Sequence, residues 1–172
     1  MKIIEYIKRK WRERILAKMA AIPHKKRLPH LDHVHSIAIV LPHESTDEER
    51  TILQFFDSQM AKRDIVVTHY RVPAADDKVN LTRLGFPSPE HLATFASHSY
   101  DMVIAATPAD DARALYAVLS AAASLRVAYD DTTLLLPSLA VRTYDLFIRA
   151  KGPCDLTNYL REILILLLKI EN

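Results

Sequence analysis

One stretch of the sequence, Ser99 to Asp131, constrains the fold more than any other. Its first part, Tyr100 to Ala106, is a short and almost continuously apolar run, which is typical of a parallel strand covered on both faces. Pro108 and the aspartates that follow it predict a helix start, because proline suits a first helical turn and carboxylates favour its positive end. A helix with one apolar face and a second apolar run, Leu125 to Ala128, complete the stretch. A strand, a helix and a strand in this order form the basic unit of a parallel α/β sheet.

Further strands and helices alternate along the rest of the chain. The other predicted strands are Ser36–Leu41, Asp64–Val72 and Tyr144–Ala150. The other predicted helices of this part run from Ser45 to about Lys62, from Ser88 to about Ala96 and over Asp155–Glu171. We therefore expect an α/β fold, with an open, mainly parallel five-stranded Rossmann-like sheet of flavodoxin-like order 2-1-3-4-5 and helices on both faces. The strands that begin at Ser36 and Tyr100 should lie adjacent at its centre, because both are continuously apolar.

The chain opens with a basic amphipathic helix, predicted over Lys2 to Ala21. Its apolar residues recur at three- and four-residue spacing, which places them along one side: Ile4, Ile7, Trp11, Ile15, Met19 and Ile22. We expect this stripe to pack on the closing helix, whose segment Ile163 to Leu168 is apolar almost all round. The chain then divides into a helix and linker, residues 1–30, and a single Rossmann-like domain, residues 31–172.

The charge of the chain is unevenly distributed. Residues 1–27 hold ten basic and two acidic side chains, a net of +8, whereas the remainder holds 13 basic and 19 acidic ones, a net of −6. Such asymmetry suggests an anionic partner, either nucleic acid or a membrane surface. The cations expected to contact that partner are Lys8, Arg9, Arg12, Lys25, Lys26 and Arg27. The alternative is that these cations form an ordinary solvated face.

Polar residues gather in the loops expected at the carboxyl ends of the two central strands, where open α/β sheets bind ligands. They are His43, Glu44, Ser45, Asp110, Asp111 and Asp130. A histidine facing carboxylates could hold Mg²⁺ or share acid–base work. The alternative is helix capping, with Ser45 and Glu48 forming a capping box and Asp110 and Asp111 capping the next helix. On that alternative Ser45→Ala should cost about 1 kcal/mol.

Several classes of site are excluded by composition. The chain has only two glycines, Gly85 and Gly152, and neither joins a strand to a helix, so the P-loop and dinucleotide-binding motifs are absent. No residue pattern predicts a cofactor or a resident metal. The single Cys154 excludes a disulfide framework and favours a reducing compartment. No apolar run is long enough to span a membrane. We therefore expect a cytoplasmic protein, with peripheral attachment to the inner membrane as an extension of this hypothesis.

The arrangement of segments resembles a known but uncharacterised family. A basic N-terminal helix, SIAIVLPHESTDEERTILQFF, GFPSPE, the Ser99 to Asp131 stretch, YDLFI and a closing apolar helix look like short bacterial α/β proteins described only as a domain of unknown function. The resemblance covers nearly the whole chain and implies a Rossmann-like fold, but it brings no catalytic residues. Members usually have a glycine after the Leu-Arg-Val strand, where this chain has Ala128 and Tyr129.

Two functional hypotheses follow from these patterns. The first is a non-catalytic Rossmann-like binding module whose basic helix docks on an anionic partner, with a protein partner also open. The second is a small-molecule or metal-binding protein or enzyme that uses the strand-end residues around His43 and Asp110. A deep pocket joining those two residues would favour the second hypothesis, whereas a flat, capped surface would favour the first.

Overall fold

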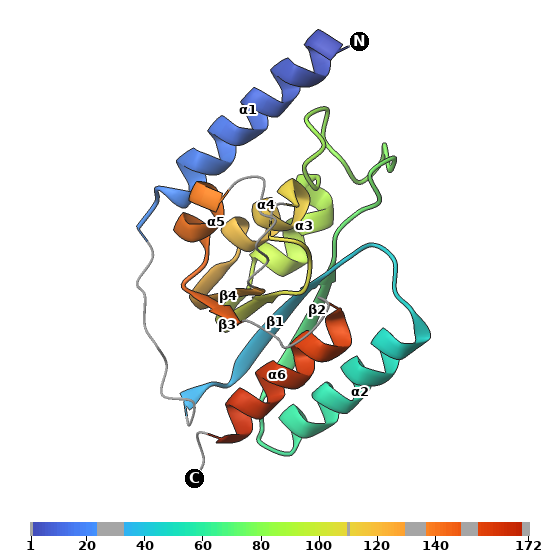
Figure 1. Ribbon diagram of the computed structural model, residues 1–172, viewed down its shortest axis with the longest axis vertical. Coiled ribbons are helices and arrows are strands. Elements are labelled where there is room, and N and C mark those ends of the chain that lie inside the picture. The colour runs from blue at the N-terminus through green and yellow to red at the C-terminus, as the bar shows by residue number, and fades with distance from the viewer. Residues whose placement is uncertain (1, 24–32, 110, 130–136, 149–154, 170–172) are drawn as a thin grey trace.

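The computed structural model describes residues 2–23, 33–109, 111–129, 137–148 and 155–169 (Figure 1). Its elements in chain order are α1 (Lys2–Ala20), β1 (Ser36–Leu41), α2 (Asp47–Ala61), β2 (Val66–Arg71), α3 (Pro89–Ala96), β3 (Ser99–Ala105), α4 (Ala112–Ser120), β4 (Ala122–Tyr129), α5 (Pro137–Thr143), β5 (Leu146–Ile148) and α6 (Leu156–Lys169). The five strands form one parallel sheet in the order β2-β1-β3-β4-β5. The predicted α/β Rossmann-like architecture is confirmed.

Strands β1 and β3 are adjacent, as predicted from their apolar character. Ile37 pairs with Met102 and Ile39 with Ile104 in a parallel register. Every residue of β1 after Ser36 is buried. Strand β2 lies at one edge, and its first residue, Val66, is 66% exposed. A strand that is buried on both faces needs a continuous apolar run, whereas an edge strand can expose side chains.

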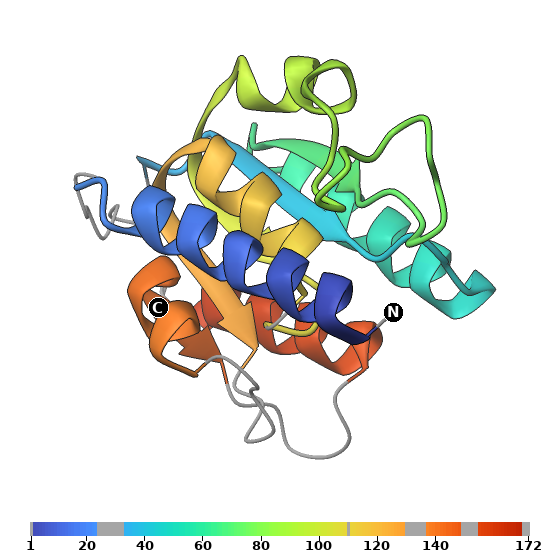
Figure 2. The same cartoon turned by 90° about the horizontal axis from the view of Figure 1, so that it is seen from above.

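Side chains of the central strands alternate between two cores, because successive residues of a strand point to opposite faces. On one face, Val40 and Val103 pack in a core that also receives side chains of α3, α4 and α5. On the other face, Ile39 and Ile104 pack in a core with side chains of α2 and α6. Helices α2 and α6 lie side by side over that face (Figure 1). Helix α1 lies outside the sheet and its helices, in contact with α4 and α5 (Figure 2).

The prediction that α1 packs on the closing helix α6 is wrong. Helix α6 contacts α2, and its apolar side chains meet Leu53, Phe56 and Met60 of that helix in one core. Helix α1 is anchored on the opposite side of the sheet through Leu16, which is 0% exposed in the core beneath α3, α4 and α5. The apolar character of α6 is therefore satisfied by α2 together with the sheet, which leaves no surface there for α1.

The starts of three helices test the capping predictions. Ser88 caps α3, with Pro89 following at the first position, and Asp111 caps α4, as predicted. The prediction for α2 is wrong by one residue, because Thr46 and Glu49, instead of Ser45 and Glu48, form the capping box. The Ser45 hydroxyl instead accepts a hydrogen bond from Nε of Arg50 at 3.2 Å.

Substitution of Thr46 by alanine should therefore cost about 1 kcal/mol of unfolding free energy. Its hydroxyl accepts from the Glu49 N–H at 3.1 Å, while Glu49 Oε2 accepts from the Thr46 N–H at 3.1 Å. Urea denaturation measures the loss. Ser45→Ala is the matched control and should cost less than about 0.5 kcal/mol. If Ser45→Ala were the more costly of the two, the cap would belong to Ser45.

Two further segments differ from the sequence-based expectation. Strand β4 begins at Ala122, three residues before the predicted Leu125, because the alanines at its start pair with Ser99 and Tyr100 of β3. Helix α5 was not among the predicted helices, and Pro137 stands at its start. Proline is tolerated in the first turn of a helix, because the backbone N–H groups of that turn have no acceptor within the helix and the one that proline lacks is not needed.

Candidate functional site

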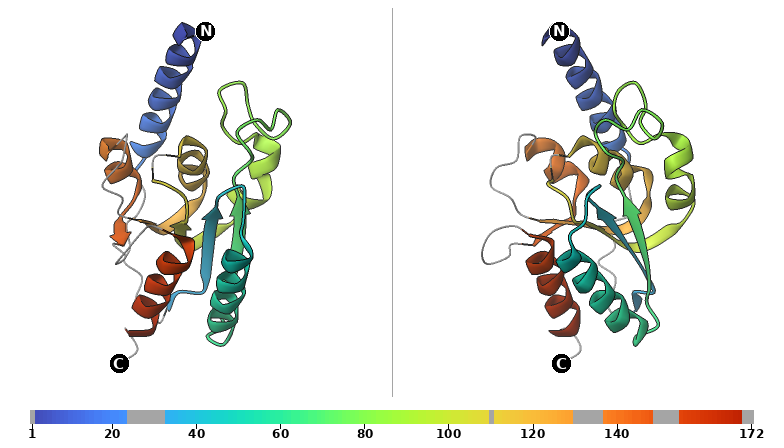
Figure 3. Two further views of the ribbon diagram at one scale, coloured as in Figure 1. Left: turned by 45° about the vertical axis from the view of Figure 1, so that its right-hand side comes forward. Right: turned by 90° about the vertical axis from the view of Figure 1, so that its right-hand side faces the viewer.

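The N-terminal half of α1 carries an exposed apolar surface. Ile3, Ile4, Ile7 and Trp11 are 74%, 60%, 48% and 55% exposed, and we call these four residues the α1 stripe. Figures 1 and 3 show that this half of the helix projects beyond the sheet and its covering helices. Large apolar side chains that cluster on a surface mark an interaction site more often than single ones do. The α1 stripe is therefore the first candidate site.

Cations surround the α1 stripe on the same helix. Residues 2–20 contain seven basic and two acidic side chains, a net of +5. Both glutamates form ion pairs within the helix, Glu5 with Lys8 at 3.3 Å and Glu13 with Lys10 at 3.0 Å. Arg14 and Lys18 are exposed and follow Trp11 at the three- and four-residue spacing that continues its side of the helix. On this side of the helix, the apolar residues up to Trp11 are thus followed by two cations.

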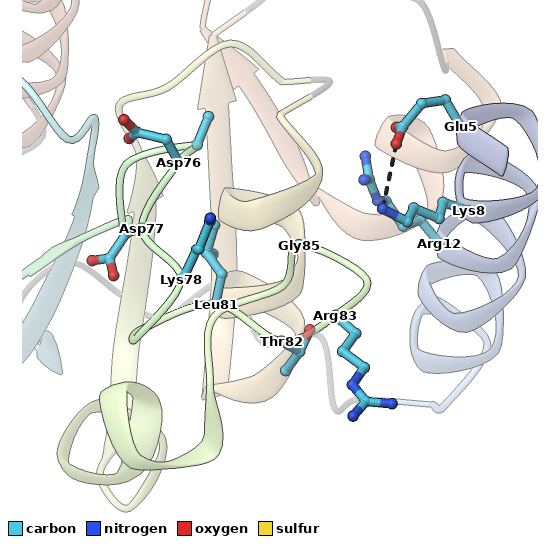
Figure 4. Close-up of a pocket in the computed structure, with 11 residues that line it drawn as sticks. Glu5, Lys8, Arg12, Asp76, Asp77, Lys78, Leu81, Thr82, Arg83 and Gly85 are labelled. Carbon is cyan, nitrogen blue, oxygen red and sulfur yellow. Dashed lines mark hydrogen bonds and ion pairs between the residues drawn. The ribbon is translucent and has the colours of Figure 1, made fainter. Parts of the chain in front are cut away.

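A crevice of about 480 Å³ separates α1 from the loop that follows β2 (Figure 4). The helix contributes Glu5, Lys8 and Arg12, which lie opposite the loop residues in Figure 4. Arg12 Nε donates a hydrogen bond to the carbonyl oxygen of Leu84. Its guanidinium lies over Gly85, where an added Cβ would lie 3.4 Å from Nη2 and where φ is +78°, a conformation that favours glycine. Arg12, one of the predicted partner-contacting cations, therefore already fixes the helix to the body.

The charges around this crevice nearly cancel. Four cations line it, Lys8, Arg12, Lys78 and Arg83, against three acids, Glu5, Asp76 and Asp77. Hydrogen bonds from the backbone and side chain of Asn80 lower the pKa of Asp77, so that this carboxylate stays charged. A crevice with mixed charge does not select an anion by itself. The hydrogen bond from Arg12 to Leu84 at this crevice joins the projecting helix to the loop.

The four predicted strand-end residues that the structure describes are exposed or bonded to residues near them in sequence. His43 and Glu44 are exposed, and Ser45 is bonded to Arg50. Asp111 accepts from the backbone N–H groups of α4 and pairs with Arg113 at 2.9 Å. Asp110 and Asp130 lie outside the described residues, as do Lys25, Lys26 and Arg27 of the predicted anionic-partner surface. Among the residues that the structure describes, no group of three or more histidine, cysteine or acidic side chains is placed to hold a metal ion.

A second cavity, of about 350 Å³, lies at the carboxyl ends of β3 and β4. It is bounded also by the first turns of α2 and α6, and neither His43 nor Asp111 lines it. Its described lining is Glu49, Ala106, Thr107, Pro108, Ala109, Tyr129, Asp155, Leu156 and Tyr159. The candidate residues predicted from the sequence at this edge of the sheet include none of these lining residues. Thr107 and Tyr129 carried a usable signal, because each stands at the carboxyl end of a predicted strand.

Comparison with known proteins adds no assignment to either site. No protein-family model matches the chain, and no curated protein matches it. Among the described helices, none combines the length and hydropathy that crossing a membrane requires. The family resemblance of the sequence remains a prediction, and the two sites have to be interpreted from their own geometry and chemistry.

Proposed function

We propose that this protein is a binding module that docks on an anionic membrane surface through helix α1. The observation that supports the proposal is the exposure of the α1 stripe on a helix that is otherwise cationic. Leu16 and Arg12 fix the helix to the body, so the stripe is held outward without a partner among the described residues. The single cysteine favours a reducing compartment, and the proposal therefore locates this surface at the cytoplasmic face of the inner membrane.

The apolar stripe favours a membrane over nucleic acid as the anionic partner. Phosphate backbones are bound by lysine, arginine and polar groups, and exposed bases stack on aromatic rings. Ile3, Ile4 and Ile7 supply none of these contacts. Interfacial helices, by contrast, combine an aliphatic and tryptophan side, which enters the boundary between headgroups and acyl chains, with lysine and arginine that face anionic headgroups. The N-terminal half of α1 has this composition.

The energy available from such docking is substantial. Full burial of a large aliphatic side chain contributes about 1.5–3 kcal/mol. Each lysine or arginine near an anionic surface adds about 1 kcal/mol, which salt screens. Arg14 and Lys18 are exposed on the side of the α1 stripe and can make this contribution. Apolar and electrostatic terms together are therefore sufficient for reversible peripheral binding.

The first test measures binding of the full chain to vesicles of phosphatidylglycerol and phosphatidylcholine. Trp11 is the only tryptophan of the chain and is 55% exposed, so its fluorescence should shift to the blue and become shielded from acrylamide when vesicles are added. The triple variant Ile4→Gln, Ile7→Gln, Trp11→Gln should lower the affinity for vesicles, measured by co-sedimentation, by roughly a hundredfold. Its melting temperature should stay close to that of the parent, because these side chains are exposed.

A matched control separates the stripe from exposed apolar surface in general. Phe55, Val79 and Val141 are 50%, 85% and 64% exposed on other elements, and their triple glutamine variant should bind vesicles like the parent. Pure phosphatidylcholine vesicles should bind weakly, and added salt should weaken binding to the mixed vesicles. The proposal is wrong if the stripe variant binds mixed vesicles normally, if duplex DNA or RNA is preferred over vesicles, or if the stripe is occupied by a second copy of the chain in solution.

A further inference from the structure

Strand β2 forms an open edge of the sheet. It is the first strand in the order β2-β1-β3-β4-β5, and the right-hand view of Figure 3 shows it in front, between α2 and α3. Val66 is 66% exposed, and His69 is also exposed. All six residues of β2 pair with β1 in one continuous register, and the strand contains no bulge, proline or lysine. A sheet edge without these protective features is a template for a further strand.

The outward backbone groups of β2 follow from its pairing with β1. The N–H of Val72, just after the strand, donates to the carbonyl oxygen of the last β1 residue at 3.0 Å. Because successive residues of a paired strand turn their backbone groups to opposite sides, Val67, His69 and Arg71 turn theirs to the open edge. The carbonyl oxygen of Arg71 already accepts a hydrogen bond from Nε2 of His91 at 3.1 Å. Val67 and His69 are therefore the residues that can offer both backbone groups to another strand.

We propose that a second copy of the chain pairs with this edge, antiparallel and about a twofold axis at Thr68. Val67 then lies opposite His69 of the second copy, and each such pair exchanges both of its backbone hydrogen bonds. This axis is the one that engages only the two outward residues whose backbone groups are available. Val66, which is exposed in the single chain, comes to lie beside Tyr70 of the second copy. The two sheets become one, related by the commonest symmetry of homo-oligomers.

The charges at the two ends of β2 favour the antiparallel orientation. The turn before the strand, residues 62–65, carries a net charge of +1, and the loop after it, residues 74–78, carries −1. These charges come from Lys62, Arg63 and Asp64 in the turn and from Asp76, Asp77 and Lys78 in the loop. An antiparallel pair places each turn near the loop of the other copy, whereas a parallel pair would place like charges together. The interface shares no residue with the α1 stripe, so either proposal can fail without the other.

The first test compares two variants at one position by sedimentation velocity of the full chain, from micromolar to millimolar concentration. His69→Pro removes an outward N–H at a position where an edge strand accepts proline, and it should weaken dimerisation at least about tenfold. His69→Val loses the same ring and its hydrogen bond with Asp57 but keeps the N–H, so it should dimerise like the parent. Equal dimerisation of the two variants would overturn the proposal. A parent chain that stays monomeric would also overturn it and would leave the edge to a strand of another protein.

Disulfide trapping tests the register separately. In a Cys154→Ser background, which removes the only cysteine, Thr68→Cys should form an intermolecular disulfide under mild oxidation. The two copies of residue 68 lie directly opposite in the proposed pair, with Cα atoms about 4.5 Å apart, which suits a disulfide. Val66→Cys is the matched control, because it is the more exposed position but its two copies would lie about 13 Å apart. No cross-link through residue 68, or equal cross-linking through residue 66, would contradict the proposed pairing.

Discussion

The variant Leu16→Ala is expected to lower the free energy of unfolding by about 2–5 kcal/mol. Among the residues of α1 whose burial the structure describes, only Leu16 is completely buried, in the core shared with α3, α4 and α5. Replacing it by alanine removes apolar contacts and leaves a cavity between α1 and the body. Urea denaturation followed by circular dichroism measures the loss. The variant should also bind vesicles more weakly, because a detached helix no longer presents its stripe in one orientation.

The matched control is Ile7→Ala, an aliphatic truncation on the same helix at a position that is 48% exposed. It should change the unfolding free energy by no more than about 0.5 kcal/mol. Equal losses in the two variants would mean that the stripe is buried in solution. No loss in Leu16→Ala would mean that α1 is not anchored. Deletion of residues 1–27 should destabilise the body, because it removes Leu16 together with the exposed half of the helix.

The sheet could be predicted because the patterns that identify its strands and helices are local in the sequence. Strands β1 and β3 are continuous apolar runs, and a run of this kind specifies a strand buried on both faces whatever its neighbours are. Helices of the predicted type lie between the strands, and the right-handed crossover rule then leaves few possible orders. The observed order β2-β1-β3-β4-β5 is one of these.

The packing of α1 could not be predicted in the same way. Three- and four-residue spacing identifies the apolar side of a helix, but it does not identify the surface that this side will meet. Leu16 lies outside the stripe of Ile4, Ile7 and Trp11, and it was Leu16 that became the anchor. Because α6 is apolar almost all round, we expected a second helix to cover it, and in the structure that helix is α2. Both errors concern contacts between elements that are distant in sequence.

The capping error has a simpler cause. The sequence contains two overlapping capping boxes, Ser45 with Glu48 and Thr46 with Glu49, and both satisfy the same spacing rule. Only the path of the loop after β1 decides which of them begins the helix. The strand-end cavity shows the same limit, since Thr107 and Tyr129 stand where the topology predicts a ligand site but Asp155 and Tyr159 arrive with α6. A site that is assembled from separate elements becomes visible only once those elements are placed.

The stability of the protein should fall steeply above pH 10, by about 1.4 kcal/mol per pH unit for each buried tyrosine that cannot ionise. Burial raises the pKa of Tyr70 and that of Tyr144; the charge of Asp111 also raises the pKa of Tyr144, while Arg126 opposes this increase. An unfolded chain ionises its tyrosines near pH 10, so the folded state, which holds them neutral, is fully favoured below that pH and loses stability above it. Urea denaturation at a series of alkaline pH values measures the slope.

Phenylalanine substitutions assign this slope to particular residues. The hydroxyls of Tyr70 and Tyr144 have no hydrogen-bond partner within the described residues, so the double variant Tyr70→Phe, Tyr144→Phe should be as stable as the parent near pH 7. Above pH 10 it should lose stability less steeply, and the slope that remains includes Tyr100, whose pKa burial also raises. Tyr6→Phe, at a position that is 54% exposed, is the control and should leave the slope unchanged. A double variant with the parent's slope would mean that water reaches these hydroxyls in the folded protein. The core on the α4 side of the sheet would then be less tightly closed than the burial of its side chains indicates.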